Sequence, residues 1–471
     1  MGERVRGERV WNHRSMQPGD LLDLDVSGVA HGGVFVARHE GRVVFIPDTL
    51  PGERVRVRLT DTRKSSFWRG EVLEVLDAAP ERRPHVWAQA DVDVAPEARP
   101  GGADFGHIDP AHQRELKHRV LVDALARIGR LDAASLAAEP VRTVAEILGQ
   151  GEGADDADAD ADGIRWRTRV SLHVDDAGRV GPYAARSHRV IEVSELPLAT
   201  ASIERAALAL RGGDAGRIDL VQPADGRVRI LHRPEPASPR GRGRGRRPAG
   251  AASDGPRRGA PENETIRERV GDREFRVDAG GFWQVHRQAA ATLTRAVTDA
   301  LTTADGAPGV DPDAWHLDLY GGVGLFAAAL ADIGGPATRV TSVESDARAT
   351  EHAGENLVEW IGARAETDRV DRWIRRLRAE ASPAERERLQ RGVVLLDPPR
   401  AGAGTGVVAD IAALSPRTVV YVACDPVALA RDLGAFRDAG YEATSLTPID
   451  LFPNSHHLEA VATLSRSDAR G

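Results

Sequence analysis

The only cysteine of this 471-residue chain, Cys424, follows the apolar run VVYVA and precedes Asp425 and Pro426. Asp is a preferred helix N-cap and Pro is favoured at the first helical position, so we expect a helix to begin directly after the thiol. A thiolate at a helix N-terminus is stabilised by the helix dipole and by free backbone amides. The pattern therefore favours a nucleophile over an inert buried cysteine, the usual state of a lone thiol.

Two carboxylates also stand at the ends of predicted strands. Asp397 ends the run VVLL and stands before Pro398 and Pro399, which restrict the backbone on both sides of their junction. This predicts a polar loop over a ligand cleft, with a purely structural turn as the alternative. Glu459 precedes the run AVATL, and burial at the start of a central strand would raise its pKa toward that of a useful base. A strand-edge Glu without a chemical role is the alternative there.

A glycine-rich turn is the remaining chemical signal. The segment DLYGGVG, residues 318–324, predicts a strand that runs into a turn where the backbone approaches a ligand closely. Glu344 follows twenty residues after Gly324, at the end of the next predicted strand, where a carboxylate can accept both hydroxyls of a ribose. The same spacing fits a dinucleotide fingerprint, so a nicotinamide-dependent dehydrogenase remains an alternative at this point.

The elements that must position these residues begin near residue 266. From there apolar runs that end in Gly, Asp or Pro alternate with helical stretches, which predicts an α/β fold with a mostly parallel sheet covered on both faces. Ligands of such sheets bind beyond the carboxyl ends of the strands. We therefore expect the strand-end residues to lie together.

The N-terminal part has a different pattern of apolar and polar residues. Residues 17–76 alternate apolar and polar side chains over short runs, which predicts a barrel of about five strands, with residues 41–59 as a hairpin that breaks at 47–52. Its many arginines suit an oligonucleotide-binding module, and a spacer barrel with solvated arginines is the alternative. Residues 110–130 predict one amphipathic helix that ends at Gly129.

Two insertions interrupt the middle of the chain. The acidic tract at 149–163 cannot form a core, and the stretch at 234–264 carries an Arg-Gly tract that either binds RNA without sequence preference or is a plain surface loop.

The net charge of −8 and the near-absence of lysine, with only Lys64 and Lys117, give no signal for RNA. No segment reaches the roughly 18 apolar residues of a membrane span, so we expect a cytoplasmic protein.

Taken together, the segments resemble the RNA (uracil-5-)methyltransferase family. The segment GFWQVH, residues 281–286, is similar to the family's Phe-Gln-Val-Asn motif, and the Asp-Pro-Pro-Arg, Cys-x-Pro and Phe-Pro…His-x-Glu motifs occur in the family's order. The resemblance implies three domains: an OB-like TRAM barrel at 12–80, an α+β domain at 81–265, and a Rossmann-like methyltransferase domain at 266–471.

The resemblance also implies roles. Cys424 would be the nucleophile that adds to C6 of a uracil and Glu459 the base that removes the C5 proton. The substrate would be a uridine of structured ribosomal or transfer RNA, flipped out of its stack. We expect a monomer with no membrane partner. Residues that would contact S-adenosylmethionine or the target base are Gln284, Tyr320, Glu344, Asp368 and Asp397.

The chain departs from the family pattern in several places. Many relatives hold an iron–sulfur cluster with four cysteines, whereas the matching stretches here, 100–107 and 195–197, contain none, so we predict no cluster. Leu325 and His286 stand where the family often has Asn, and Asp425 adds a negative charge beside the thiol unless it caps the helix. These departures leave a second hypothesis open, an RNA-binding assembly factor or chaperone with a degenerate methyltransferase domain.

Overall fold

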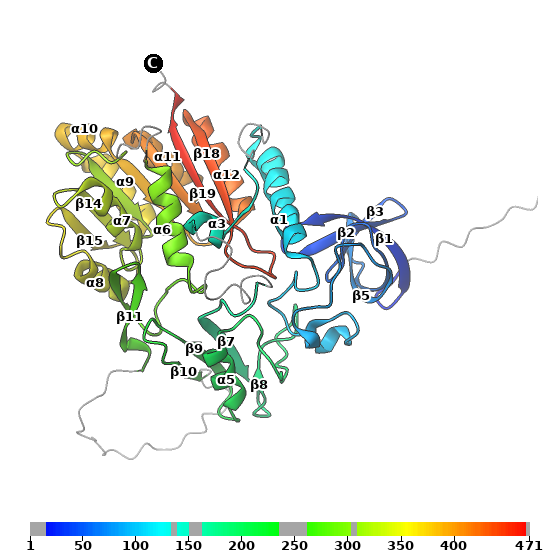
Figure 1. The fold of residues 1–471 in the computed structure, drawn as a ribbon. Helices are drawn as coiled ribbons and strands as arrows, with labels where there is room; N and C mark the ends of the chain where they lie inside the picture. Colours follow the sequence, from blue (N-terminus) through cyan, green and yellow to red (C-terminus); the bar gives the residue numbers. More distant parts are fainter. Residues whose placement is uncertain (1–15, 133–138, 150–162, 235–260, 303–308, 468–471) are drawn as a thin grey trace, which may run out of the picture. The chain divides into compact units, whose positions relative to one another are not determined.

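The computed structural model describes residues 16–132, 139–149, 163–234, 261–302 and 309–467 (Figure 1). The acidic tract and the Arg-Gly tract of the sequence lie almost entirely outside these residues. The chain divides into two compact units, Met1–Arg82 with Val92–Pro96 and Arg83–Asp91 with Glu97–Gly471. No helix among the described residues is long and apolar enough to cross a membrane.

The smaller unit is the predicted five-stranded barrel. Side chains of alternate strand residues, such as Phe35, Val44 and Val57, are fully buried inside it, as the alternating pattern requires. Its closed strand order is β1-β2-β3-β5-β4. The strands are β1 (Leu21–Ala30), β2 (Val34–His39), β3 (Arg42–Ile46), β4 (Arg54–Asp61) and β5 (Phe67–Asp77).

The predicted hairpin at 41–59 is wrong. Strand β3 pairs with β2 and, in parallel, with β5, while β4 pairs with β1 and β5. The connection between β3 and β4 folds around Glu53, whose buried carboxylate accepts the backbone N–H of Leu50 at 2.8 Å and binds Arg82. Because β5 lies between the two strands, this loop crosses from one side of β5 to the other.

An eight-stranded sheet dominates the larger unit, in the order β15-β14-β13-β16-β17-β19-β18-β6. Strands β13 to β17 are mutually parallel, and β19 enters antiparallel to both β17 and β18, which confirms the predicted mostly parallel sheet. Its strands are β6 (Arg142–Thr143), β13 (Trp315–Leu319), β14 (Arg339–Glu344), β15 (Ala363–Thr367), β16 (Val393–Leu396), β17 (Thr418–Ala423), β18 (Tyr441–Asp450) and β19 (Glu459–Arg466).

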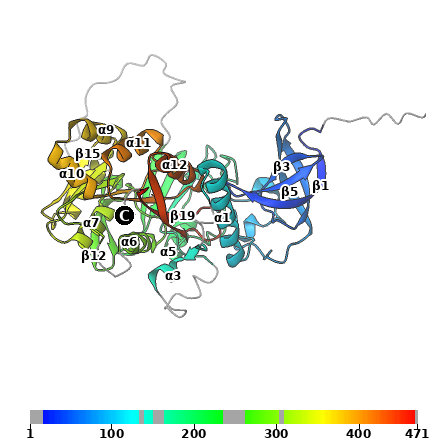
Figure 2. The ribbon, with the colours of Figure 1, turned by 90° about the horizontal axis from the view of Figure 1, so that it is seen from above.

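Two hydrophobic cores cover the two faces of this sheet. Val393 and Leu395 of β16 join the core under α3, α6 and α7, whereas Val394 and Leu396 join the core under α1, α9, α11 and α12. The two helix layers lie on opposite sides of the sheet in Figure 2. The helices are α1 (Pro110–Ala124), α3 (Val144–Leu148), α6 (Ala289–Ala300), α7 (Leu325–Gly334), α8 (Ala347–Asn356), α9 (Val370–Glu380), α10 (Pro383–Arg391), α11 (Thr405–Leu414) and α12 (Pro426–Asp438).

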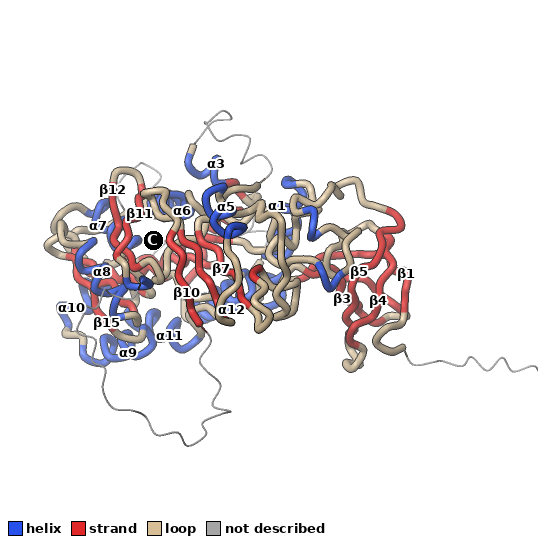
Figure 3. Tube along the Cα trace, turned by 90° about the horizontal axis from the view of Figure 1, so that it is seen from below, coloured by secondary structure: helices blue, strands red, loops and turns tan. Residues whose placement is uncertain are grey.

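The predicted helix at 110–130 is confirmed as α1, which continues in a π-helical turn to Gly129. A smaller four-stranded sheet, in the order β10-β9-β7-β8, and the hairpin β11-β12 complete the larger unit (Figure 3). These elements are β7 (Arg169–Val174), β8 (Val180–Gly181), α5 (Ala201–Ala209), β9 (Gly216–Val221), β10 (Arg229–Pro234), β11 (Thr265–Val270) and β12 (Arg273–Asp278).

Candidate active site

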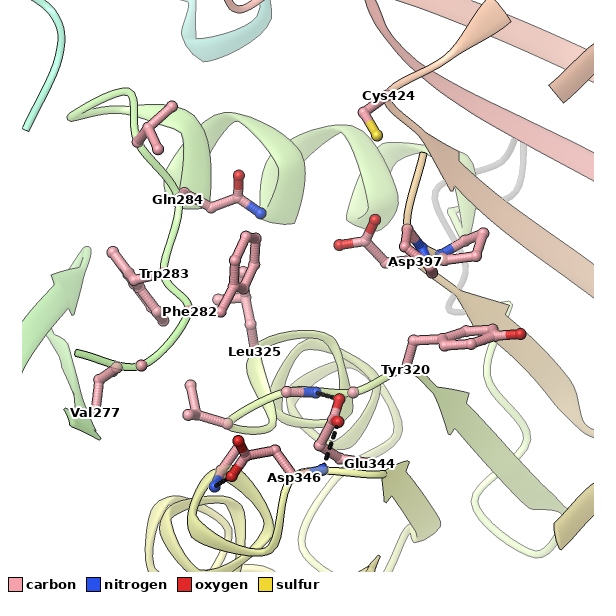
Figure 4. A pocket seen from close by; sticks show the side chains of 18 of the residues that line it. Val277, Phe282, Trp283, Gln284, Tyr320, Leu325, Glu344, Asp346, Asp397 and Cys424 are labelled. Carbon is pink, nitrogen blue, oxygen red and sulfur yellow. Dashed lines mark hydrogen bonds between the residues drawn. The ribbon is translucent and has the colours of Figure 1, made fainter. Parts of the chain in front are cut away.

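A cavity of about 1270 Å³ opens at the carboxyl ends of β13, β14, β16 and β17 (Figure 4). The strand-end residues meet there, as expected for a parallel sheet. Six of the seven site residues predicted from the sequence line it, and Asp368 does not; the six are Gln284, Tyr320, Glu344, Asp397, Cys424 and Glu459.

The glycine turn after β13 forms one wall of the cavity. Tyr320 adopts a φ of 63°, a left-handed conformation that is uncommon for a residue with a side chain. A Cβ on Gly321 would lie 2.0 Å from the Ser342 hydroxyl and 2.5 Å from the Asp318 carboxylate, so this position requires glycine. Gly322, with a φ of 54°, has open space where its Cβ would be. The turn thus leaves room for a ligand against its backbone.

Glu344 at the end of β14 supports the same turn. One carboxylate oxygen accepts the backbone N–H groups of Ser345 at 2.5 Å and Asp346 at 2.8 Å. Among the described residues, the other oxygen accepts only the N–H of Gly322, at 3.2 Å. A carboxylate oxygen can take a further donor, so Glu344 can accept a ribose hydroxyl. Gln284 extends its amide into the cavity from the opposite wall in Figure 4. These residues fit S-adenosylmethionine.

Asp368 is held away from this cavity. Its carboxylate accepts the backbone N–H of Arg369 at 2.8 Å and forms an ion pair with Arg376 at 2.8 Å. Arg369 and Asp371, two neighbours that the sequence did not single out, line the cavity in its place.

Cys424 and Glu459 come together through the pairing of β17 with β19. The last residues paired in this antiparallel ladder are Ala423 and Ala460. Cys424 and Glu459 stand one position beyond that pair, and opposed residues of an antiparallel ladder project to the same face. The expectation of a buried Glu459 in a central strand is confirmed, because its exposed fraction is 5%.

The environment of the thiol differs from the sequence-based expectation. Asp425 caps α12, as proposed, and its carboxylate accepts the N–H groups of Val427 at 3.0 Å and Ala428 at 2.8 Å. These amides are therefore taken by the cap and do not stabilise a thiolate. Burial, together with the charges of Glu459 and Asp397, raises the pKa of Cys424 to about 12. The thiol pKa is therefore raised by burial and by these carboxylates, whereas the position at a helix terminus had suggested a lowered pKa.

Burial governs the carboxyl groups as well. It raises the pKa of Asp397 to about 7, with a further contribution from Asp318, which is fully buried on the adjacent strand. Burial and the charge of Asp397 also raise the pKa of Glu459 well above its usual value. The guanidinium of Arg400 opposes these effects, since it lowers the pKa of both Cys424 and Glu459.

The polar segment before Glu459 is anchored by residues that sequence analysis missed. Lys117 of α1, fully buried, donates to Asp450 at 2.6 Å and to the carbonyl of Phe452 at 3.0 Å. Gln113, one turn earlier, exchanges hydrogen bonds with the side chain and backbone of Asn454 at 2.9 and 2.8 Å. One signal could have revealed Lys117, because it is one of only two lysines in an arginine-rich chain.

The family departures have structural roles. His286 does not line the cavity; it stacks on Trp166 with ring centres 5.5 Å apart, and burial lowers its pKa to about 3. Leu325 begins α7, contributes to the core and borders the cavity.

Comparisons with known proteins show which family the chain is similar to. Residues 16–73 match the TRAM domain, and residues 269–467 match the tRNA (uracil-5-)-methyltransferase family. An RNA methyltransferase of Streptomyces avermitilis is 35% identical over 462 residues, which cover 95% of this chain and 98% of the relative. An RNA methyltransferase of Streptomyces coelicolor is 36% identical, and the match covers 95% of this chain and 93% of the relative.

Among solved structures, the tRNA (uracil-54, C5)-methyltransferase of Pyrococcus abyssi in complex with S-adenosyl-L-homocysteine has a TM-score of 0.60. The two sequences are 20% identical, and the match covers 94% of this chain and 99% of the Pyrococcus abyssi chain. The likeness therefore extends over the whole fold. The likeness shows a Rossmann-like methyltransferase fold, and the family model and the relatives give the class of protein, an RNA methyltransferase.

The chain belongs to the RNA (uracil-5-)methyltransferase family. This membership removes the dehydrogenase alternative that the glycine turn had left open.

Proposed function

We propose that the protein methylates C5 of a uridine in structured ribosomal or transfer RNA through a covalent adduct between Cys424 and C6 of the uracil. The observation that carries the proposal is the placement of Cys424 and Glu459 opposite one another across β17 and β19, in the cavity that Asp397 and Glu344 also line. A nucleophile and a base on facing strands can reach the two carbons of one pyrimidine double bond.

The proposed reaction begins at the thiol. The Cys424 thiol loses its proton, its sulfur bonds to C6, and the electron pair of the C5–C6 double bond makes C5 nucleophilic. C5 then takes the methyl group. Glu459 removes the proton from C5, the sulfur leaves C6, and the double bond forms again. The products would be 5-methyluridine, the S-adenosylhomocysteine left by the methyl donor, and the thiol, which regains a proton; the proton from C5 is released.

S-adenosylmethionine supplies the methyl group when bound. We assign Glu344 to the ribose hydroxyls and place Tyr320, Gln284 and Asp397 against the cofactor or the target base, since all four line the cavity. Asp368 has the weakest support, because its carboxylate is paired with Arg376. The barrel, a TRAM domain, would hold the RNA around the target nucleotide.

Activation of the thiol is the demanding step of this proposal. The raised pKa of Cys424, about 12, keeps the thiol protonated in the free protein. A high pKa makes the thiolate a stronger nucleophile once it forms. Among the described residues, Arg400 is the cation that lowers the pKa of Cys424. We therefore assign it to stabilisation of the thiolate.

RNA transcripts that contain 5-fluorouridine test the mechanism, because fluorine at C5 cannot leave as a proton and the adduct accumulates. With S-adenosylmethionine present, we expect an adduct between RNA and wild-type protein that is stable in denaturing gels and absent in Cys424→Ser. An RNA that is methylated in its normal form but gives no adduct in its fluorinated form would overturn the covalent mechanism.

Substitution of Glu459 tests the base. Glu459→Gln should form a methylated adduct with ordinary RNA that breaks down slowly, whereas unchanged turnover would remove Glu459 from this role.

Mass-spectrometric mapping of 5-methyluridine in ribosomal and transfer RNA from a deletion strain identifies the target: the modified site should be unmethylated in that strain alone.

A further inference from the structure

A second cavity, of about 690 Å³, adjoins the first within the larger unit. It is built on β7 and β9 of the four-stranded sheet and on the segment at 182–187. The two cavities share Gly102, Arg167, Arg233, residues 280–283 and Val285 in their walls. The proposed methyl transfer uses only the first cavity, so the second has no assigned role.

Positive charge dominates the walls of this second cavity. Among the described residues that line it, the one acidic residue is Asp219, which is shared by Arg217 at 2.6 Å and Arg233 at 2.8 Å. A third arginine, Arg169, has its partner outside the cavity, Glu268, at 3.3 Å. The carboxylate available in the walls is therefore already taken.

Arg167, which borders both cavities, lacks a carboxylate partner within the described part of the chain. Its Nε donates to the backbone carbonyl of Arg169 at 3.0 Å, and its guanidinium carbon lies 5.7 Å from the ring centre of Trp166. Arg400 across the first cavity also bears a positive charge, and burial together with that charge lowers the pKa of Arg167. An anion placed at Arg167 would relieve this uncompensated charge.

Two further donors in the same walls lack acceptors among the described residues. The indole N–H of Trp87 and the Nε–H of Arg169 are buried without a hydrogen-bond partner. Buried donors are ordinarily satisfied, so such groups indicate a missing ligand or water. Since all of these groups donate, the ligand they suit is rich in acceptors.

The remaining walls suit a flat ring. Tyr183 and His173 stack with ring centres 3.6 Å apart at an angle of 14°. Apolar side chains provide the rest of the lining, namely Val170, Leu172, Leu196, Leu198 and Leu220. An apolar lining with a few polar donors and a cation is the usual composition of a site for a nucleobase and its phosphate.

We propose that this second cavity binds the nucleotide adjoining the target uridine, with its phosphate at Arg167 and its base beside Trp87. The inference rests on the proposed function, because the shared wall at Arg167 places the next nucleotide of an RNA chain here when the target uridine occupies the first cavity. The cavity would then determine the sequence context of methylation as well as affinity.

Binding of a short fluorescent oligouridylate, followed by anisotropy, tests the phosphate contact. Arg167→Gln should weaken binding and reduce the slope of log K against log salt concentration by about 0.7, the value for one phosphate of a single strand. The matched control is Arg205→Gln, which should leave the slope unchanged. Arg205 lies on the exposed side of α5 and its side chain is directed to Ser202.

Methylphosphonates, which remove the charge of one phosphate at a time, localise the contact. In an RNA that the wild-type enzyme methylates, one neutral linkage beside the target should raise KM for the wild type and have no effect on Arg167→Gln. If the variant keeps the sensitivity of the wild type to every linkage, Arg167 does not bind phosphate and the inference is wrong.

Trp87→Phe tests the base, because it keeps a six-membered aromatic ring and deletes the indole N–H together with the five-membered ring. We expect a higher KM with an unchanged kcat, and we expect this effect to vanish with RNA that lacks the neighbouring base. An effect of equal size with the abasic RNA would exclude base recognition by Trp87. Thermal stabilisation by S-adenosylhomocysteine confirms that each variant is folded.

These outcomes separate the two proposals. If the wild type methylates RNA while Arg167→Gln and Trp87→Phe behave as wild type, only the inference about the second cavity fails. If the wild-type protein neither binds nor methylates any RNA, the proposed function fails with it.

Discussion

Lys117 and Asp450, which are 333 residues apart in the chain, form a buried ion pair with 2.6 Å between Nζ and Oδ1. The lysine also donates to the carbonyl of Phe452, at the start of the polar segment that leads to Glu459. The N-terminal helix α1 therefore fixes the approach to the proposed base. A buried pair of this kind is costly to break, because the remaining charge has no partner.

Lys117→Met should lower the free energy of unfolding by about 3–5 kcal/mol, since it leaves the Asp450 carboxylate buried and unpaired. Urea unfolding followed by circular dichroism measures this loss. The other lysine of the chain offers a control: Lys64 is exposed on the barrel, and Lys64→Met should change the unfolding free energy little. Equal effects of the two substitutions would contradict the role of the pair.

Asp397→Asn should make Cys424 more reactive toward iodoacetamide at constant pH. The negative charge of Asp397 raises the pKa of the thiol, so its removal lowers that pKa and increases the thiolate fraction. Arg400→Gln should have the opposite effect, because the guanidinium lowers the thiol pKa. Mass spectrometry of the alkylated peptide gives both rates, and Asp299→Asn, on the exposed face of α6, serves as the control.

Alkylation of Cys424 in the wild-type protein should accelerate about tenfold for each pH unit from about pH 7 to about pH 9. With a pKa of about 12, the thiolate fraction increases with pH throughout this range and does not level off. A rate that reaches a plateau near neutral pH would show that the thiol is already ionised there.

Gly321→Ala should abolish measurable binding of S-adenosylhomocysteine by isothermal titration calorimetry. The added methyl group would lie 2.0 Å from the Ser342 hydroxyl and 2.5 Å from Asp318, so the turn must move. Gly354→Ala is the matched control, because its Cβ meets nothing within 4 Å on the exposed face of α8. It should bind normally and gain about 0.5–1 kcal/mol of stability.

The sequence predicted those parts of the site that depend on local pattern. Cys424, Asp397 and Glu344 each end an apolar run, and the parallel order of the strands brings such ends together. The helix after Cys424 could be predicted from Asp425 and Pro426, which begin α12 as expected.

Features set by distant contacts could not be predicted in this way. The raised pKa of Cys424 arises from burial and from Glu459 and Asp397, whose proximity depends on the sheet order. A local pattern suggested a hairpin at 41–59, but barrel closure inserts β5 between its strands. Asp368 carries a carboxylate at a strand end, yet Arg376 pairs with it.

The ladder between β17 and β19 has a consequence for how this enzyme tolerates change. Helix α12 and strand β18 separate Cys424 from Glu459 along the chain, but the pairing of Ala423 with Ala460 determines where the two side chains project. Insertions in the loop between α12 and β18 should therefore be neutral for catalysis. A single-residue deletion inside β19 would turn the carboxylate to the opposite face of the sheet, so selection acts here on register rather than on chain length.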